Sequence, residues 1–307
     1  MKIVYLGTPD FAVAPLEEIV KAGYEVVAVI TQPDKPVGRK QILTPSAVKQ
    51  CALNLGIKVL QYDKIRLEGV EDLKELNPDL MVTCAYGQIL SQEILDIPKL
   101  GTINIHASLL PSLRGSSPIQ WSIINGDTKT GITIMMTDIG IDTGDIILQE
   151  EVEISPNETG GELFDKLSIL GAKSIVKALD LFKNNQVVRT PQNHDLATHT
   201  KMLKKESGKI DFSKSSKDVH NLIRGLNPWP VAYFSINGEI IKAYKSQPIF
   251  DDYGDFGRVF IKGKDLIISC GQGAIKLEEV QRAGSKRMPT AVFLNGFKIE
   301  EGIKVDD

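Results

Sequence analysis

The chain has 307 residues, of which 42% are hydrophobic and 24% are charged, and its formal net charge is −3. At ~150 residues per domain this length predicts about two domains. The composition is typical of a globular protein, and the small negative charge excludes a polyanion-binding surface over the whole chain while permitting a local basic one.

The termini and the cysteines carry information about location. The chain opens with a strand-like run over residues 1–6, without a charged leader, and no segment approaches the ~20 apolar residues of a membrane span. Cys51, Cys84 and Cys270 lie far apart and match no metal-binding spacing. We therefore expect reduced core thiols, no metal site and a cytoplasmic protein.

The first half of the chain alternates short apolar runs with helical patterns. The expected strands are residues 3–6, 25–30, 58–60, 80–84 and 102–105, and the expected helices are 11–22, 45–55, 65–76 and 119–125. Continuous apolar runs separated by helices predict a parallel sheet covered on both faces. Strands at 131–136 and 145–152 and a long helix at 159–182 complete a doubly wound, mostly parallel α/β domain.

The pattern changes after about residue 190. One helix is expected at 216–224, and short strands are expected at 231–236, 239–244, 257–261, 266–269 and 274–280. Asn237-Gly238 between two of these runs is a strong hairpin signal. This spacing predicts a small OB-like β-barrel domain. We expect a catalytic domain at 1–189, a basic linker at 190–205 and the barrel at 206–307.

The turn after the first strand does not have the pattern of a dinucleotide site. It reads Gly7-Thr-Pro-Asp-Phe-Ala12, so the G-x-G-x-x-G fingerprint is absent. Asp10 would place a negative charge near a phosphate, and it suits a helix cap better. A Rossmann-type oxidoreductase is therefore disfavoured.

Asn104 and His106 lie two residues apart at the end of a predicted strand. Side chains at i and i+2 of a strand point to the same face. An amide and an imidazole could thus converge on one reacting carbonyl, the first as a hydrogen-bond donor and the second as a group that moves protons. The alternative is that the pair satisfies nearby backbone groups.

An acidic, glycine-rich loop follows in the sequence Asp138-Ile-Gly-Ile-Asp142-Thr-Gly-Asp145. Asp138 and Asp145 are expected to satisfy the backbone of the turn. Asp142 would orient the imidazole and help to transfer protons if the loop folds toward His106.

Two basic stretches stand out against the neutral average. The segment 31–46 contains three prolines and a basic cluster, and we expect it to be a long, irregular, mobile loop. The second stretch comprises Lys201, Lys204, Lys205, Lys209, Lys214 and Lys217. Solvated lysines explain such a stretch in most proteins, but two basic elements beside one cleft would suit a phosphate backbone.

Six longer motifs occur in order from residue 6 to residue 230: L-G-T-P-D-F-A, T-Q-P-D-K-P-V-G-R, A-Y-G, I-N-I-H-A-S-L-L-P-S-L-R-G, D-I-G-I-D-T-G-D and N-P-W-P. Together they resemble the methionyl-tRNA formyltransferase family. The Asn-x-His…Asp set marks the wider group of formyl-transferring folate enzymes, and the basic loop and the N-P-W-P junction narrow it.

The resemblance implies a reaction and a set of site residues. The reaction is transfer of a formyl group from 10-formyltetrahydrofolate to the α-amine of methionyl-initiator tRNA, without a metal, by a monomer with no membrane partner. The implied catalytic residues are Asn104, His106 and Asp142. The implied folate-binding residues are Ser108, Leu109, Leu110, Pro111, Ala85, Tyr86 and Gly87, and the implied tRNA-binding residues are Arg39, Lys40, Lys35, Lys204, Lys205 and Lys209.

Other functions remain open at this point. The same catalytic set could formylate a ribonucleotide amine or an amino sugar, although a small substrate does not need a basic loop and a β domain. A formate-releasing hydrolase usually carries a regulatory domain before the catalytic one. An RNA-binding protein with an inactive α/β platform is a fourth reading. We expect His194, His199 and His220 to be exposed and without function.

Overall fold

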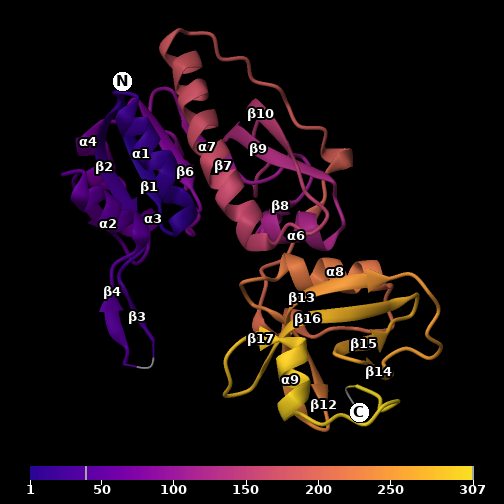
Figure 1. The fold of residues 1–307 in the computed structure, drawn as a ribbon. Coiled ribbons are helices and arrows are strands. Elements are labelled where there is room, and N and C mark those ends of the chain that lie inside the picture. The colour runs from indigo at the N-terminus through magenta and orange to yellow at the C-terminus, as the bar shows by residue number, and fades with distance from the viewer. Residues whose placement is uncertain (39, 306–307) are drawn as a thin grey trace. The chain divides into compact units, whose positions relative to one another are not determined.

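The computed structural model describes residues 1–38 and 40–305 of the chain (Figure 1). These residues form two compact units. The first unit comprises Met1–Gly115, Thr130–Val152 and Phe164–Thr200, and the second comprises Ser116–Lys129, Glu153–Leu163 and Lys201–Asp307.

A seven-stranded sheet forms the centre of the first unit. In spatial order its strands are β10 (Ile146–Glu153), β9 (Lys129–Met136), β7 (Thr102–His106), β6 (Leu80–Cys84), β1 (Lys2–Gly7), β2 (Glu25–Thr31) and β5 (Val59–Gln61). The strands from β7 to β5 are parallel to their neighbours, and β9 is antiparallel to β7. The predicted doubly wound, mostly parallel sheet is confirmed.

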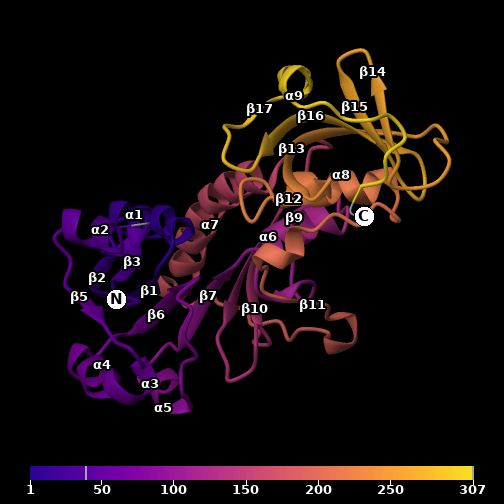
Figure 2. The same cartoon turned by 90° about the horizontal axis from the view of Figure 1, so that it is seen from below.

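Helices cover both faces of this sheet. In Figure 2, α1 (Val13–Lys21), α2 (Ala47–Asn54) and α7 (Gly160–Lys183) lie above it, and α3 (Ile65–Glu68), α4 (Val70–Leu76) and α5 (Gln92–Leu95) lie below it. Strand β1 is buried on both sides because its side chains alternate. Val4 and Leu6 join a core cluster with Ile65 and Leu73 of α3 and α4. The hydroxyl of Tyr5 donates to the carbonyl of Ala12, just before α1.

The segment 31–46 differs from its prediction. Instead of a wholly irregular loop, it contains a short antiparallel hairpin of β3 (Lys35–Val37) and β4 (Ile42–Thr44), which projects away from the sheet in Figure 1. Three prolines and the lack of alternation hid this hairpin from sequence analysis. A network at its base holds it: Lys49 Nζ donates to Asp34 Oδ2 and to Gln61 Oε1, both at 2.7 Å.

The single helix predicted for residues 65–76 is also wrong, because the structure divides it at Gly69. The backbone there closes tightly on α3. A Cβ at this position would lie 2.8 Å from Ile65 Cγ1. The apolar periodicity of the two short helices is continuous, so it could not reveal the break.

The second unit contains a six-stranded antiparallel sheet, which confirms the predicted small β domain. Its strands are β12 (Ala232–Ile236), β13 (Glu239–Ile249), β16 (Ala274–Arg282), β15 (Asp265–Ser269), β14 (Val259–Lys262) and, paired with β16, β17 (Met288–Pro289). The sheet curves around α8 (Ser216–Gly225) in Figure 2. Phe234, Ile241 and Leu277 of the sheet share one core cluster with Val219 and Ile223 of α8.

Shorter elements complete both units. They are the 3-10 helices η1 (Asp10–Ala12), η2 (His194–Leu196) and η3 (Lys205–Gly208), the strands β8 (Arg114–Gly115) and β11 (His199–Thr200), and the helices α6 (Pro118–Ile124) and α9 (Thr290–Gly296). Strand β11 pairs with β8 in the first unit. In the second unit, the indole nitrogen of Trp121 on α6 donates to the carbonyl of Lys201.

The cysteines are buried and free, as predicted. Burial raises the pKa of Cys51 to about 11 and the pKa values of Cys84 and Cys270 to about 12. These thiols are therefore protonated near neutral pH, which removes them as nucleophiles. Across residues 1–38 and 40–305, no helix is both long and apolar enough to cross a membrane.

Of the three histidines predicted to be exposed, one is not. His194 and His199 are exposed, but His220 is buried in the second unit. Its Nε2 lies 3.4 Å from the carbonyl of Pro156, a residue far away in sequence. Burial of this kind depends on tertiary packing, which the local polar sequence around His220 could not indicate.

Candidate active site

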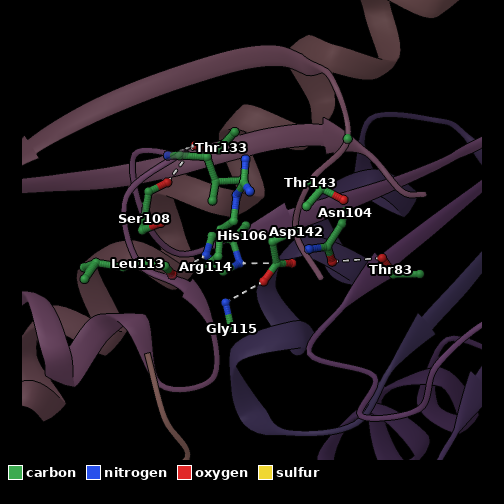
Figure 3. Close-up of polar contacts among 12 residues, drawn as sticks. Thr83, Asn104, His106, Ser108, Leu113, Arg114, Gly115, Thr133, Asp142 and Thr143 are labelled. Carbon is green, nitrogen blue, oxygen red and sulfur yellow. Dashed lines mark hydrogen bonds and ion pairs between the residues drawn. The ribbon is translucent and has the colours of Figure 1, made fainter. Parts of the chain in front are cut away.

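Strand β7 delivers Asn104 and His106 to one face of the sheet at the strand's carboxyl end. The intervening Ile105 points to the other face, toward α7. A Cβ added at Gly171 of α7 would lie 3.2 Å from Ile105 Cγ2. This arrangement follows from the period of two along a strand. Both polar side chains lie near Asp142 in Figure 3.

The amide of Asn104 is oriented by a hydroxyl on the neighbouring strand. Thr83 Oγ1 of β6 lies 2.8 Å from Asn104 Oδ1 and donates to it. The register of the parallel pair, with Thr83 opposite Asn104, makes this contact possible. Because the amide oxygen accepts this hydrogen bond, the NH₂ group is the end that faces Asp142 (Figure 3).

The imidazole of His106 is buried, with 6% of its surface exposed, and both of its nitrogens face acceptors. Nε2 lies 3.0 Å from the carbonyl oxygen of Leu113. A carbonyl can only accept, so Nε2 carries a proton. Nδ1 lies 3.6 Å from Asp142 Oδ1, a distance too long for a hydrogen bond. Protonation of Nδ1 would create an ion pair at this position.

Asp142 reaches His106 because its loop doubles back over the sheet. Strand β9 runs antiparallel to β7, so Met136 at its end lies opposite Ile103, near the start of β7. The loop after β9 therefore has to return toward the carboxyl end of β7. The amide of Gly115 holds the carboxylate there, donating to Asp142 Oδ2 at 2.8 Å.

Two backbone features make this return possible. Asp142 adopts a φ of 53°, in the left-handed region that aspartate tolerates better than most residues. At Gly144 a Cβ would lie 2.0 Å from the carbonyl oxygen of Met136, so only glycine fits. The glycine-rich acidic motif is thus a tight loop with one carboxylate aimed inward.

The loop that follows β7 is tied down by hydroxyl and amide groups. Thr133 Oγ1 of β9 donates to the carbonyl of Ser108 at 2.7 Å and accepts from the amide of Leu110 at 3.1 Å. Gln149 Nε2 of β10 donates to the carbonyl of Leu110 at 2.8 Å. The hydroxyl of Ser108 donates to the carbonyl of Ser112. These bonds fix the segment next to His106.

The residues predicted to bind folate are not equally placed to do so. Ser108 and Leu110 are buried within the loop just described, whereas Leu109 and Pro111 are half-buried. In the segment after β6, Ala85 and Gly87 are exposed. The ring of Tyr86 is 4% exposed and packs in the core against α3 and α4, so its side chain does not line a slot.

Exposed apolar side chains occur in the same loops. Ile141, next to Asp142, is 66% exposed, and Ile89, in the segment after β6, is 74% exposed. A flat apolar ring needs such a surface, since ligand sites are mostly apolar with a few polar groups. Leu109, Ile141 and Ile89 thus supply apolar side chains in the loops that follow β7, β9 and β6, respectively.

The residues predicted to bind tRNA divide between the two units. Lys35 and Lys40 are exposed on the β3–β4 hairpin of the first unit. Arg39 lies outside the described residues. Lys204, Lys205 and Lys209 are exposed in the second unit, in and beside η3. Each set consists of exposed lysines of its own unit.

Sequence analysis missed the residues that support the candidate catalytic groups. Thr83, the Leu113 carbonyl and Gly115 make direct contacts to Asn104, His106 and Asp142, respectively. Arg114 and Gly115 belong to the L-R-G motif, which was a usable signal, whereas Thr83 had none. Among the described residues, no group of three or more His, Cys, Asp or Glu side chains could hold a metal ion.

Two family models match the chain. The model of the formyl transferases matches residues 1–179, and the model of the formyl transferase C-terminal domain matches residues 202–298. Together with the site at the end of β7, these matches place the protein in the class of formyl transferases.

Relatives narrow the class. The methionyl-tRNA formyltransferase of Agathobacter rectalis is 49% identical over 306 residues, covering 98% of each chain, and that of Acetivibrio thermocellus is 47% identical with the same coverage. The chain belongs to the methionyl-tRNA formyltransferase family. A solved N-formyltransferase from Helicobacter canadensis, in complex with folinic acid and dTDP-3-aminofucose, has a TM-score of 0.71 and 26% identity, covering 92% of this chain and 99% of that one.

Proposed function

We propose that this protein transfers the formyl group of 10-formyltetrahydrofolate to the α-amine of methionyl-initiator tRNA, for translation initiation. The convergence of Asn104, His106 and Asp142 at the end of β7 supports formyl-transfer chemistry. The near-full-length identity to methionyl-tRNA formyltransferases supports the acceptor. The folate supplies an activated formyl group on its N10 nitrogen.

Asn104 is the proposed donor to the formyl oxygen. The neutral amine attacks the formyl carbon, a new carbon–nitrogen bond forms, and negative charge develops on the oxygen. Thr83 already holds the amide with its NH₂ group toward the site. A donor fixed before the reaction stabilises developing charge without reorganisation during it.

His106 Nδ1 is the proposed site of proton transfer. Nε2 is engaged with the Leu113 carbonyl, so Nδ1 is the nitrogen that gains and loses a proton. When protonated, Nδ1 donates to the reacting group and lies against Asp142. As the bond between the formyl carbon and N10 breaks, N10 receives the electron pair and takes this proton, because an amide-like nitrogen leaves poorly as an anion.

Asp142 closes the proton cycle in this proposal. Its carboxylate accepts the proton that the attacking nitrogen loses and returns it to His106 Nδ1. One proton leaves the amine and one arrives at N10, so the enzyme ends in its starting state. The Gly115 amide keeps the carboxylate in place during this exchange.

The remaining residue roles belong to the same proposal. Leu109 and Pro111 contact the folate through their side chains. The other predicted folate-binding residues contact it through backbone groups; they are Ser108, Leu110, Ala85, Tyr86 and Gly87. The phosphates of the tRNA contact Arg39, the hairpin residues Lys35 and Lys40, and Lys204, Lys205 and Lys209 of the second unit. We place the catalytic domain at 1–189, the linker at 190–205 and a tRNA-binding domain at 206–307, in a monomeric cytoplasmic protein.

The decisive assay measures transfer of labelled formyl from 10-formyltetrahydrofolate to methionyl-tRNA. Free methionine and a nucleotide-linked amino sugar are offered in parallel, since a solved relative with a similar fold is bound to the latter class of molecule. We expect label only on methionyl-tRNA. Label on the amino sugar alone would replace the proposed acceptor, and formate release alone would indicate a hydrolase.

The hairpin has its own test. A Lys35→Ala/Lys40→Ala variant should raise KM for methionyl-tRNA and leave KM for the folate unchanged. The slope of the logarithm of tRNA affinity against the logarithm of salt concentration should also become less steep, by the share of about two phosphate contacts. Lys99→Ala is the matched control, because this exposed lysine precedes the amino end of β7, whereas the hairpin follows the carboxyl end of the parallel strand β2. Equal effects on both substrates would remove the hairpin from tRNA recognition.

A further inference from the structure

Gln192 lies next to the site although it is 50 residues from Asp142 in sequence. It follows α7 in the stretch before η2, and only 5% of its surface is exposed. Buried amide side chains are normally fully hydrogen-bonded. The partners of Gln192 are the backbone of the Asp142 loop on one side and a buried guanidinium on the other.

The nitrogen of Gln192 spans the turn that contains Asp142. Nε2 donates to the carbonyl of Asp142 at 2.9 Å and to the carbonyl of Gly144 at 2.8 Å. The two N–H groups of one amide thus tie together the residues on either side of Thr143. Asp142 has a left-handed φ here, which is unfavourable unless its surroundings hold it.

The oxygen of Gln192 connects this turn to the other support of the carboxylate. Oε1 accepts from Arg114 at both Nε (3.1 Å) and Nη2 (2.7 Å). Arg114 is 3% exposed and directly precedes Gly115, whose amide donates to Asp142 Oδ2. Gln192 therefore links the turn that bears Asp142 to the segment Arg114-Gly115, whose backbone amide holds the Asp142 carboxylate.

We infer that Gln192 is a positioning residue for Asp142, an inference that rests on the proposed role of Asp142 in proton transfer. The position requires two donors and one acceptor at once, and glutamine provides all three. A glutamate keeps the acceptor for Arg114 but loses the donors. A leucine of similar size loses both.

The test compares Gln192→Glu, Gln192→Leu and Asn193→Ala in the full chain. Asn193 is the matched control, since it is an exposed neighbour whose side chain only caps η2. Displacement of a catalytic group by about 1 Å can lower the rate ~10²-fold. We expect kcat to fall ~10–100-fold in both Gln192 variants, with KM for methionyl-tRNA within about 3-fold, and to stay within about 2-fold in Asn193→Ala.

A double-mutant cycle separates positioning from general destabilisation. In an Asp142→Ala background, Gln192→Leu should lower kcat by no more than about 2-fold further, because its effect passes through Asp142. If the fall in kcat of the double variant equals the product of the falls in the two single variants, the inference is overturned. Full kcat in Gln192→Glu would also overturn it. If the wild-type chain fails to formylate methionyl-tRNA, the proposed function fails instead, whatever the Gln192 variants do.

Discussion

The two units each contain one buried histidine, and the pair shows what distinguishes a reactive imidazole from a structural one. His106 in the first unit is 6% exposed and His220 in the second is 7% exposed, so burial does not separate them. Their partners do. His106 faces a carbonyl and a carboxylate, and His220 faces a carbonyl and a hydroxyl.

This difference decides which hydrogen bonds each ring can complete. Nε2 of His220 can donate to the Pro156 carbonyl while Nδ1 accepts from the Ser246 hydroxyl, so the neutral ring is fully satisfied. Burial lowers the pKa of His220, and the nearby Arg224 adds to this effect. His106 instead presents Nδ1 to Asp142 Oδ1 at 3.6 Å, without a hydrogen bond.

The largest expected effect comes from removing the reactive member of the pair. His106→Ala should lower kcat for formyl transfer by about 10³-fold or more, since it removes both a proton-transfer group and a donor. The measurement is single-turnover transfer to methionyl-tRNA, with thermal unfolding to verify that the variant folds. The matched change, His220→Gln, should leave kcat within about 2-fold. Retention of a tenth of the activity by His106→Ala would contradict the assigned role.

The second-largest fall in kcat is expected from substitution of Asn104. Asn104→Ala removes the donor to the formyl oxygen and should lower kcat ~10²–10³-fold with little change in KM for the folate. Asn104→Asp, nearly the same shape, should be at least as damaging because its charge opposes the developing oxyanion. Higher activity in Asn104→Asp than in Asn104→Ala would show that the amide does not donate to this oxygen.

A smaller effect is expected from the hydroxyl that orients the amide. Thr83→Val keeps the shape of the side chain but frees Asn104 to rotate, and we expect a loss in kcat of about 10-fold. Thr83→Ser restores the hydroxyl and should recover most of the rate. If valine and serine behave alike, Thr83 acts through packing and not through its hydrogen bond to Asn104.

The sequence predicted the elements that depend on local pattern. Strand β6 is observed at the predicted bounds, and Asn104 and His106 share a face because strand geometry requires it. The hairpin at 35–44 and the break at Gly69 were missed, since prolines masked the first and unbroken periodicity masked the second. These errors concern short elements whose stability comes from contacts that the local sequence does not encode.

The site itself was predictable in part. The approach of Asp142 to His106 was expected only on condition that its loop folds back, and this depends on Gly115 and Gln192, 27 and 50 residues away. His220 was expected to be exposed, but it is buried with its ring nitrogens against the carbonyl of Pro156 and the hydroxyl of Ser246. In both cases the deciding contact is long-range, and a polar residue among polar neighbours carries no signal of it.

The last and smallest effect concerns stability and not activity. Because the pKa of His220 is lowered on folding, the unfolded chain binds more protons below the ordinary histidine pKa of ~6.5. The second unit should therefore be most stable above this pH and lose stability as the pH falls toward 5.5, with a slope of at most about 1.4 kcal/mol per pH unit for one proton.

Tryptophan fluorescence can measure this directly, because both tryptophans of the chain, Trp121 and Trp229, belong to the second unit. Urea unfolding midpoints at pH 7.5 and 5.5 should differ less in His220→Gln than in the wild type, since glutamine can keep both hydrogen bonds without titrating. Glu278 and Arg224 also act on the ring, but both are present in the two proteins, so the comparison isolates the histidine. The same pH dependence of the unfolding midpoint in both proteins would contradict the assignment of His220 as a structural histidine that is neutral in the folded state.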